Sequence, residues 1–124
     1  MSGLQSALDE LAAEDVGRLT DEQTLDRTAE LVAARNRIDA ELTRTVRHGE
    51  TAQAPERDGL TSMRSWLIGH ARVSAVEASK VVRAGRALEH FPHVAAGFAA
   101  GDISAARVEA VSYTHLTLPT ILRV

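Results

Sequence analysis

Cysteine is absent from this sequence and aromatic residues are scarce, and both facts restrict the fold and the chemistry. Without cysteine the chain has no disulfide and no thiolate metal ligand, which favours a reducing, cytoplasmic location. Because only 3% of the residues are aromatic, alanine, valine, leucine and isoleucine must build the core. Small aliphatic side chains suit closely packed helices better than strands. We therefore expect an all-α fold.

Long apolar runs are missing as well. No segment approaches the roughly 20 apolar residues of a membrane span, and the acidic N-terminus MSGLQSALDELAAED lacks the apolar stretch of a signal peptide. We therefore expect no membrane partner. With 124 residues, of which 44% are hydrophobic and 25% charged, the chain has the size and composition of one soluble domain.

The formal net charge of −3 is unevenly distributed along the chain. Residues 1–50 carry 11 acidic and 6 basic side chains, whereas residues 51–110 carry 6 acidic and 7 basic ones. The first half should therefore repel nucleic acid, and only the second half is suited to approach a phosphate backbone. Its slight basic excess is far below that of a dedicated DNA-binding domain. Any contact with DNA is therefore expected to be weak.

Two helices are expected in the first fifty residues. The second is the longest of the chain: Thr20 and Gln23 form a capping box at its start, and basic residues up to about Arg47 precede Gly49 at its end. A linker of mixed composition, ETAQAPERDG, then covers about residues 49–60. The first helix starts at Ser2 and has three leucines on one face, Leu4, Leu8 and Leu11.

Further helices are expected after the linker, which makes about five to six in an elongated domain with one long helix. Each has a local start signal, either a serine or threonine cap or a proline in the first turn. Gly101 is expected to end the helix that begins at Pro92. The predicted start residues are Thr61 or Ser62, then Ser74, Pro92 and Ser104.

The helix that begins after Ser74 combines an apolar face with a basic one. The preceding helix carries the single tryptophan, Trp66, which is expected to anchor the core. Together the two helices have the order and spacing of a helix-turn-helix motif. The turn lacks the usual glycine, so an ordinary solvated basic face is the competing interpretation. Under the DNA-binding interpretation, Ser79 or Glu77 reaches a base edge. The phosphate contacts are then predicted to be Arg72, Lys80, Arg83 and Arg86.

No arrangement of residues predicts catalysis, a cofactor, a metal or a small-molecule substrate. His90 and His93 have a spacing that suits one metal, but no acidic or cysteine ligand follows them. His48 is expected to be a cation at a helix end, and His70 a half-buried side chain. An HNH motif needs a strand-helix unit with a histidine base beside metal ligands, and that spacing is absent.

Residues 111–124 differ in character from the rest, since residues 1–110 contain 21 alanines and this tail contains none. Its threonine, tyrosine and valine favour a terminal β-strand. However, VSYTHLTLPT resembles in all ten residues the in-frame translation of a transposase-based sequencing adapter. We therefore interpret 111–124 as a non-native tail and expect the helical domain, truncated at its C-terminus, to occupy residues 1–110.

The order and spacing of several short motifs resemble domain-of-unknown-function family 222, the helical 13E12-repeat domain. The similarity covers most of residues 20–110, including the centre of the long helix at residues 33–35. Arg107 departs from the pattern, because a histidine is expected there. The motifs are Asp58-Gly59, Ser62 with Trp66-Leu67, Ser74 to Ala78, Leu88 to Pro92, and Ala99-Ala100-Gly101-Asp102-Ile103-Ser104.

This family often precedes an HNH endonuclease domain. The resemblance therefore implies a non-catalytic N-terminal domain of an HNH-associated protein, which positions or weakly binds DNA. No nuclease portion is present in this sequence, so the activity of the parent protein stays open. The alternative is a helical protein-interaction or dimerisation module without nucleic-acid function, whose working surface is the long helix, Asp21 to Arg47. Self-association is then expected through exposed apolar helix faces.

Overall fold

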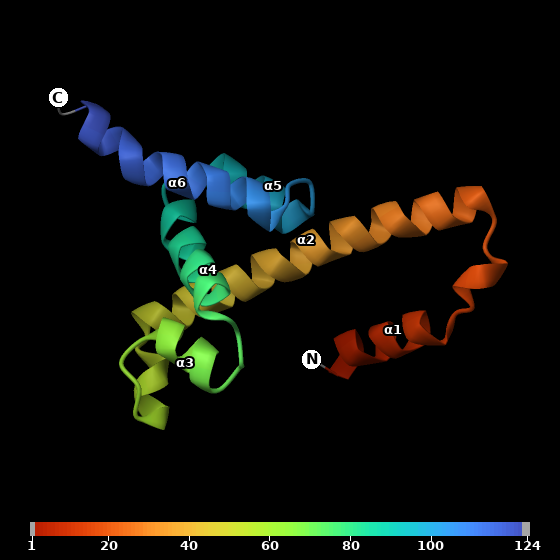
Figure 1. The fold of residues 1–124 in the computed structure, drawn as a ribbon, viewed down its shortest axis with the longest axis horizontal. Coiled ribbons are helices and arrows are strands. Elements are labelled where there is room, and N and C mark those ends of the chain that lie inside the picture. Colours follow the sequence, from red (N-terminus) through yellow and green to blue (C-terminus); the bar gives the residue numbers. More distant parts are fainter. Residues whose placement is uncertain (1, 123–124) are drawn as a thin grey trace. The chain divides into compact units, whose positions relative to one another are not determined.

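The computed structural model describes the backbone of residues 2–122 and the side chains up to Tyr113. These residues form six α-helices and two short 3₁₀ helices joined by turns, with no strand among them (Figure 1). The expected all-α fold, with about five to six helices and one long helix, is confirmed. The chain divides into two compact units, Met1–Leu31 and Val32–Val124.

The first unit contains α1 (Ser2–Ala13), the 3₁₀ helix η1 (Val16–Arg18) and the start of α2 (Asp21–Thr51). The predicted capping box opens α2. The backbone N–H of Gln23 donates to Thr20 Oγ1 at 3.2 Å, and the Thr20 N–H donates to Gln23 Oε1 at 3.0 Å.

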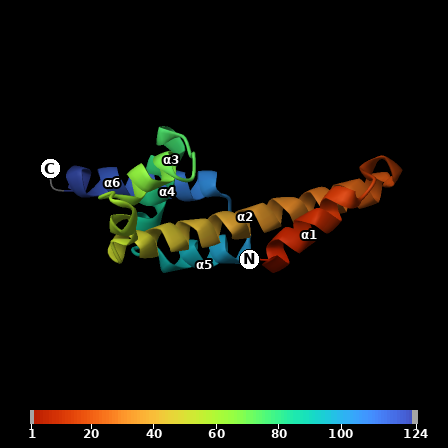
Figure 2. The ribbon, with the colours of Figure 1, turned by 90° about the horizontal axis from the view of Figure 1, so that it is seen from below.

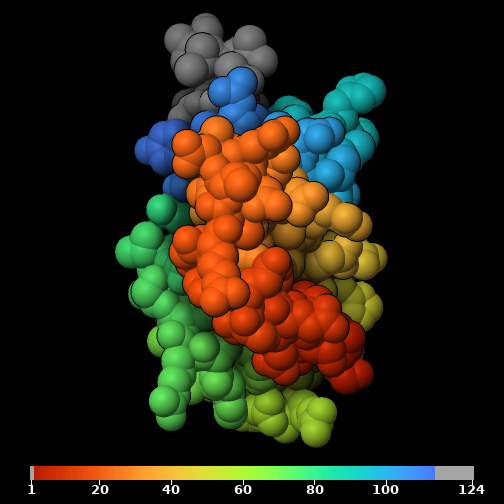
Figure 3. All heavy atoms as spheres, turned by 90° about the vertical axis from the view of Figure 1, so that its right-hand side faces the viewer, coloured from red at the N-terminus to blue at the C-terminus, as the bar shows by residue number. Residues whose placement is uncertain are grey.

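Polar contacts of Arg27 join the end of α1 to the start of α2. Arg27 Nη2 donates to the carbonyl of Leu11 at 3.2 Å, and the same guanidinium forms an ion pair with Glu14. No residue of α1 is buried, and the side chains of this helix lie open in the space-filling view (Figure 3). The leucine-bearing face expected for α1 is therefore present but builds no core.

The long helix continues past the predicted end, because Gly49 does not terminate it. Gly49 is buried, and a Cβ added there would lie 2.7 Å from Met63 Sδ, so the glycine makes room for the next helix. The helix ends at Thr51, and Gln53 then adopts the left-handed φ of 56°. The linker expected at about residues 49–60 is shorter in the structure, since Ala54–Asp58 form the 3₁₀ helix η2 with Pro55 buried.

Four helices follow in the second unit, and their start signals act as predicted. The Ser62, Ser74 and Ser104 hydroxyls each accept a backbone N–H three residues later, at 3.1, 3.1 and 3.2 Å. The fourth begins at Pro92, and Gly101 (φ 87°) ends it in a left-handed C-cap. The four are α3 (Met63–Gly69), α4 (Ala75–Leu88), α5 (Pro92–Ala100) and α6 (Ala105–Leu122).

Helix α4 is the centre of the second unit, since it contacts α3, α5 and α6 (Figures 1 and 2). Ala78, Val82 and Gly85 of its apolar face are buried, and Ala84 and Ala87 are buried too, because neighbours cover this helix on more than one side. Gly85 permits the approach of α2: a Cβ there would lie 3.0 Å from Arg47 Cβ. The buried residues form two clusters, Ala40, Ala84, Phe98 and Val108, and Val46, Leu67, Ala78 and Val82.

Phe98, rather than Trp66, is the large fully buried side chain of the core, with 1% of its surface exposed. Trp66 is half-buried at the edge of one cluster. Its Nε1–H donates to Asp58 Oδ2 at 2.8 Å, and its ring stacks on His70. Trp66 therefore fixes the end of η2 against α3, while α5 supplies the main apolar anchor.

The segment interpreted as a non-native tail begins inside a helix, because α6 runs without interruption from Ala105 to Leu122. Ser112 is 1% exposed, and its hydroxyl donates to the carbonyl of Val108 at 2.8 Å. The side chains of residues 114–124 lie outside the described part of the chain. A deletion that starts at Val111 would thus remove a buried residue, and the foreign origin of the tail stays a prediction.

Within the described residues, no helix is both long and apolar enough to span a membrane.

Candidate nucleic-acid interface

The two helices compared with a helix-turn-helix, α3 and α4, are joined by a tight turn at residues 70–74. Arg72 adopts the left-handed φ of 58° in this turn, in the conformation that glycine usually takes. The N–H of Val73 donates to the carbonyl of Leu67 at 3.0 Å and closes the turn. The predicted pair of capped helices is therefore present, with an arginine where the comparison expects glycine.

The four predicted phosphate contacts do not form one surface of unpaired cations. Lys80 Nζ lies 3.5 Å from Glu109 Oε2, and Arg83 Nη2 lies 3.7 Å from Glu109 Oε1. Arg86 forms an ion pair with Glu50, while Arg72 lies exposed in the turn. Most of the basic face of α4 therefore meets carboxylates of neighbouring helices.

A groove of about 480 Å³ brings two of these four residues together with a third arginine. Arg83 and Arg86 enter it from α4, and Arg64 enters from α3, where its Nε donates to Ser79 Oγ at 2.8 Å. We call this the basic groove. Its lining residues are Glu50, Ser62, Arg64, Ser79, Val82, Arg83, Arg86, Ala87 and His90.

Arg64 and His90 line the basic groove but are not among the predicted phosphate contacts, whereas Lys80 and Arg72 are predicted contacts that do not line it. Periodicity assigned Arg83 and Arg86 to one face of α4, but it says nothing about which residue of α3 faces them. The approach of Arg64 depends on the turn that folds α3 back against α4. Arg64 stands alone two residues after the Ser62 cap, and nothing in this local sequence predicts that it approaches α4.

Glu50 is the only carboxylate of the basic groove, and two arginines hold it. Glu50 Oε1 accepts hydrogen bonds from Arg86 Nε at 3.0 Å and from Arg47 Nη1 at 2.7 Å. Arg47 also bonds Glu89, with Nε 2.6 Å from Oε1. This network joins the end of α2 to α4, and it leaves the groove with three arginines against one carboxylate.

The network predicts how stability changes in acid. Hydrogen bonding from Arg86, and then from Arg47, lowers the pKa of Glu50 below its ordinary value. A lowered carboxylate pKa contributes stability above the unfolded-state pKa, and this contribution is lost as pH falls through the folded-state value. We therefore expect the free energy of unfolding to decrease below about pH 4.3, the ordinary glutamate value.

Urea unfolding at a series of pH values tests this, with Glu50→Gln as the comparison. The variant should be less stable at pH 7 and should lose less stability on acidification. Asp39 acts in the opposite direction, because burial raises its pKa, and the comparison with Glu50→Gln separates the two effects. Equal acid sensitivity in both proteins would show that Glu50 carries none of it.

None of the histidines whose side chains the structure describes belongs to a cluster that could hold a metal ion. His90 and His93 are both exposed, and the described residues contain no group of three or more His, Cys, Asp or Glu side chains that could hold a metal ion. His70, expected to be half-buried, is exposed and stacks on Trp66 with ring centroids 5.4 Å apart. His48 is exposed in the last turn of α2, as its predicted position at a helix end requires.

Comparison with known proteins agrees with the resemblance drawn from the motifs. A family model described as a domain of unknown function, DUF222, matches residues 25–121, which is well over half of the chain. The match also extends beyond residue 110. No curated protein and no solved structure matches the chain significantly. On the strength of the family match, the chain belongs to the DUF222 family of helical domains of unknown function.

Proposed function

We propose that this chain is a non-catalytic helical domain of an HNH-endonuclease-associated protein, and that it positions the protein on DNA through weak phosphate contacts in the basic groove. The observation that carries the proposal is the charge of that groove. Arg64, Arg83 and Arg86 line it together with a single carboxylate, Glu50, which is already bonded by two arginines.

The groove also supplies a hydrogen-bond donor of the kind that contacts phosphate and sugar. Ser79 lines the groove, and its hydroxyl accepts from Arg64 Nε at 2.8 Å and keeps its own O–H to donate. The Ser62 hydroxyl already donates to Ser65 Oγ. Contacts to phosphate and sugar fix the position of a protein on the duplex but carry no sequence information. The small number of arginines implies weak, salt-sensitive binding without marked sequence preference.

A charge-reversal experiment distinguishes the groove from the rest of the basic surface. Arg64→Glu with Arg83→Glu changes two groove residues, and Arg72→Glu with Lys80→Glu makes the same change in charge outside the groove. Arg83 and Lys80 each form an ion pair with Glu109. Each double variant therefore removes one ion pair to Glu109, which makes the two variants comparable in this respect as well. Binding to a labelled DNA duplex is measured by fluorescence anisotropy at several salt concentrations.

We expect the groove pair to lower the affinity far more than the matched pair does. It should also reduce the slope of log affinity against log salt by about 2, since each lost phosphate contact removes about 1. Equal losses from both pairs would indicate general electrostatic attraction and exclude the groove as the site. Metal-dependent cleavage of the duplex by the purified chain would contradict the non-catalytic assignment.

A second candidate function is favoured by a different surface. An apolar groove, which Lys80 helps to line, is formed by residues of α2, α3, α4, α5 and α6. An apolar depression of this kind suits contact with a protein helix rather than with DNA. The chain would then act as an interaction or dimerisation module.

A further inference from the structure

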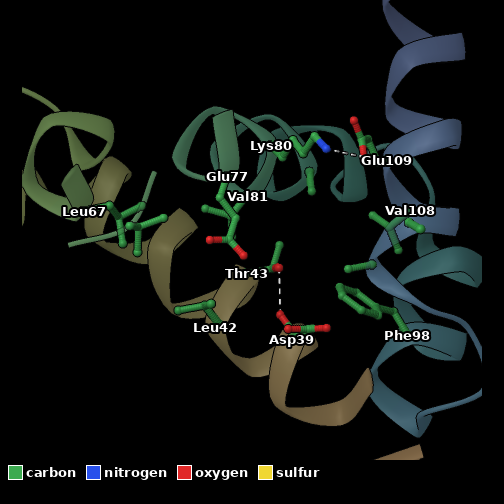
Figure 4. Close-up of a pocket in the computed structure, with 14 residues that line it drawn as sticks. Asp39, Leu42, Thr43, Leu67, Glu77, Lys80, Val81, Phe98, Val108 and Glu109 are labelled. Carbon is green, nitrogen blue, oxygen red and sulfur yellow. Dashed lines mark hydrogen bonds and ion pairs between the residues drawn. The ribbon is translucent and has the colours of Figure 1, made fainter. Parts of the chain in front are cut away.

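The apolar groove has a volume of about 390 Å³ and lies entirely within the second unit. Phe98 and Val108 lie at one end in Figure 4, and Leu42 and Leu67 at the other. Leu42 is 47% exposed although it lines the groove, so the apolar lining reaches the molecular surface. A surface of this kind is ordinarily covered when the protein functions.

Two acidic side chains lie between the apolar ends of the groove. The carboxylates of Asp39 and Glu77 come from α2 and α4 and lie in the middle of the close-up, between the apolar ends (Figure 4). Burial and the nearby charge of Glu77 raise the pKa of Asp39, whereas Arg35 lowers it. Lys80, which also lines the groove, forms an ion pair with Glu109. The groove therefore complements a helix that presents aliphatic side chains next to a cation.

The chain itself carries such a helix face beside the groove. Arg35, Ile38, Leu42 and Thr45 follow one another at intervals of three and four residues on α2, which places them on one side of the helix. All four are exposed, with Ile38 at 43%. Leu42 belongs both to this face and to the groove, so the two surfaces are continuous.

We propose that the apolar groove holds α2 of a second copy of this chain, in a symmetric antiparallel dimer. Ile38 and Leu42 of each copy pack into the groove of the other, and Arg35 faces Asp39 and Glu77 across the interface. Because the apolar-basic face and the acidic groove adjoin on one molecule, a two-fold axis satisfies both at once. Helix α1 is a poorer occupant, since its residues include Asp9 and Glu10 but no cation.

Sedimentation velocity over a range of protein concentrations tests the proposal. The native chain should dimerise as its concentration rises, and Ile38→Glu should shift the protein to monomer. Leu25→Glu is the matched control, because Leu25 is a 69% exposed leucine on the same helix but lies in the first unit. Circular dichroism checks that both variants keep their helices, as substitutions at exposed positions should.

An exchange of charges gives a sharper test of the arrangement. Arg35→Glu places like charges opposite each other in its own dimer, and Glu77→Arg weakens its own dimer in the same way. A mixture of the two variants restores opposite charges at both contacts, so the mixed dimer should form at concentrations at which neither variant dimerises alone. This readout depends on pairing between copies and not on the stability of either monomer.

Three results would overturn the proposal. These are a native chain that stays monomeric at all concentrations, a dimer that survives Ile38→Glu, and variants that fail to recover dimerisation when mixed. The outcome is independent of DNA binding, because none of the changed residues lines the basic groove.

Discussion

Replacing Gly101 with alanine should lower the free energy of unfolding by about 2 to 5 kcal/mol, through a backbone penalty and a steric one. Gly101 has a φ of 87°, and a residue with a Cβ pays roughly 1 to 2 kcal/mol there. The added Cβ would also lie 2.8 Å from the carbonyl oxygen of Ala33 and 3.0 Å from Arg37 Cγ. The end of α5 would then have to move away from α2.

That displacement would break a buried hydrogen bond. Asn36 is 5% exposed, and its Nδ2 donates to the carbonyl of Gly101 at 3.1 Å. Leaving such a donor unpaired adds to the loss, because a buried amide without a partner has lost its contact with water. Urea denaturation followed by circular dichroism measures the change.

Gly59→Ala is the control for this experiment. Gly59 has a similar φ of 77°, but no atom lies within 4 Å of an added Cβ. Its replacement should cost only the backbone term, about 1 to 2 kcal/mol. Similar losses for the two variants would mean that the steric contact of the added Cβ with α2 contributes nothing to the loss at Gly101.

Phe98→Ala should be more damaging still, with an expected loss of about 3 to 5 kcal/mol. The Phe98 ring is the largest fully buried side chain among the described residues and packs with Ala40, Ala84 and Val108. Its buried neighbours are two alanines and a valine, whose short side chains fill the resulting cavity poorly. For a domain whose total stability is about 5 to 15 kcal/mol, this loss is a large fraction of the whole.

Variants of the tryptophan and a milder change at Phe98 provide the comparison. Trp66→Phe removes the hydrogen bond to exposed Asp58 and reduces the ring that stacks on His70, and it should cost about 1 kcal/mol. Phe98→Leu keeps most of the buried volume, so its loss of stability should lie between those of Trp66→Phe and Phe98→Ala. If Trp66→Ala destabilised the protein more than Phe98→Ala, the tryptophan would be the main anchor, as the sequence alone suggested.

The amino-acid sequence by itself determined where most of the helices begin and where α5 ends. Ser62, Ser74 and Ser104 each bond a backbone N–H three residues ahead, and Thr20 and Gln23 bond each other. These bonds join residues of a single turn, so their geometry follows from local spacing whatever the rest of the chain does. The all-α fold was predictable for a related reason, because scarce aromatics and many alanines favour helices.

The contacts between side chains of different helices depend on the tertiary structure alone. Gly49 lies inside α2 rather than after it, because Met63 packs against it from the next helix. Lys80 and Arg83 meet Glu109, whereas Arg64 joins Arg86 in the basic groove. Contacts of this kind depend on which helices pack together and at what depth, and a single sequence carries no local signal for either. The residues that line the basic groove and the apolar groove are therefore determined by how α4 packs against its neighbours.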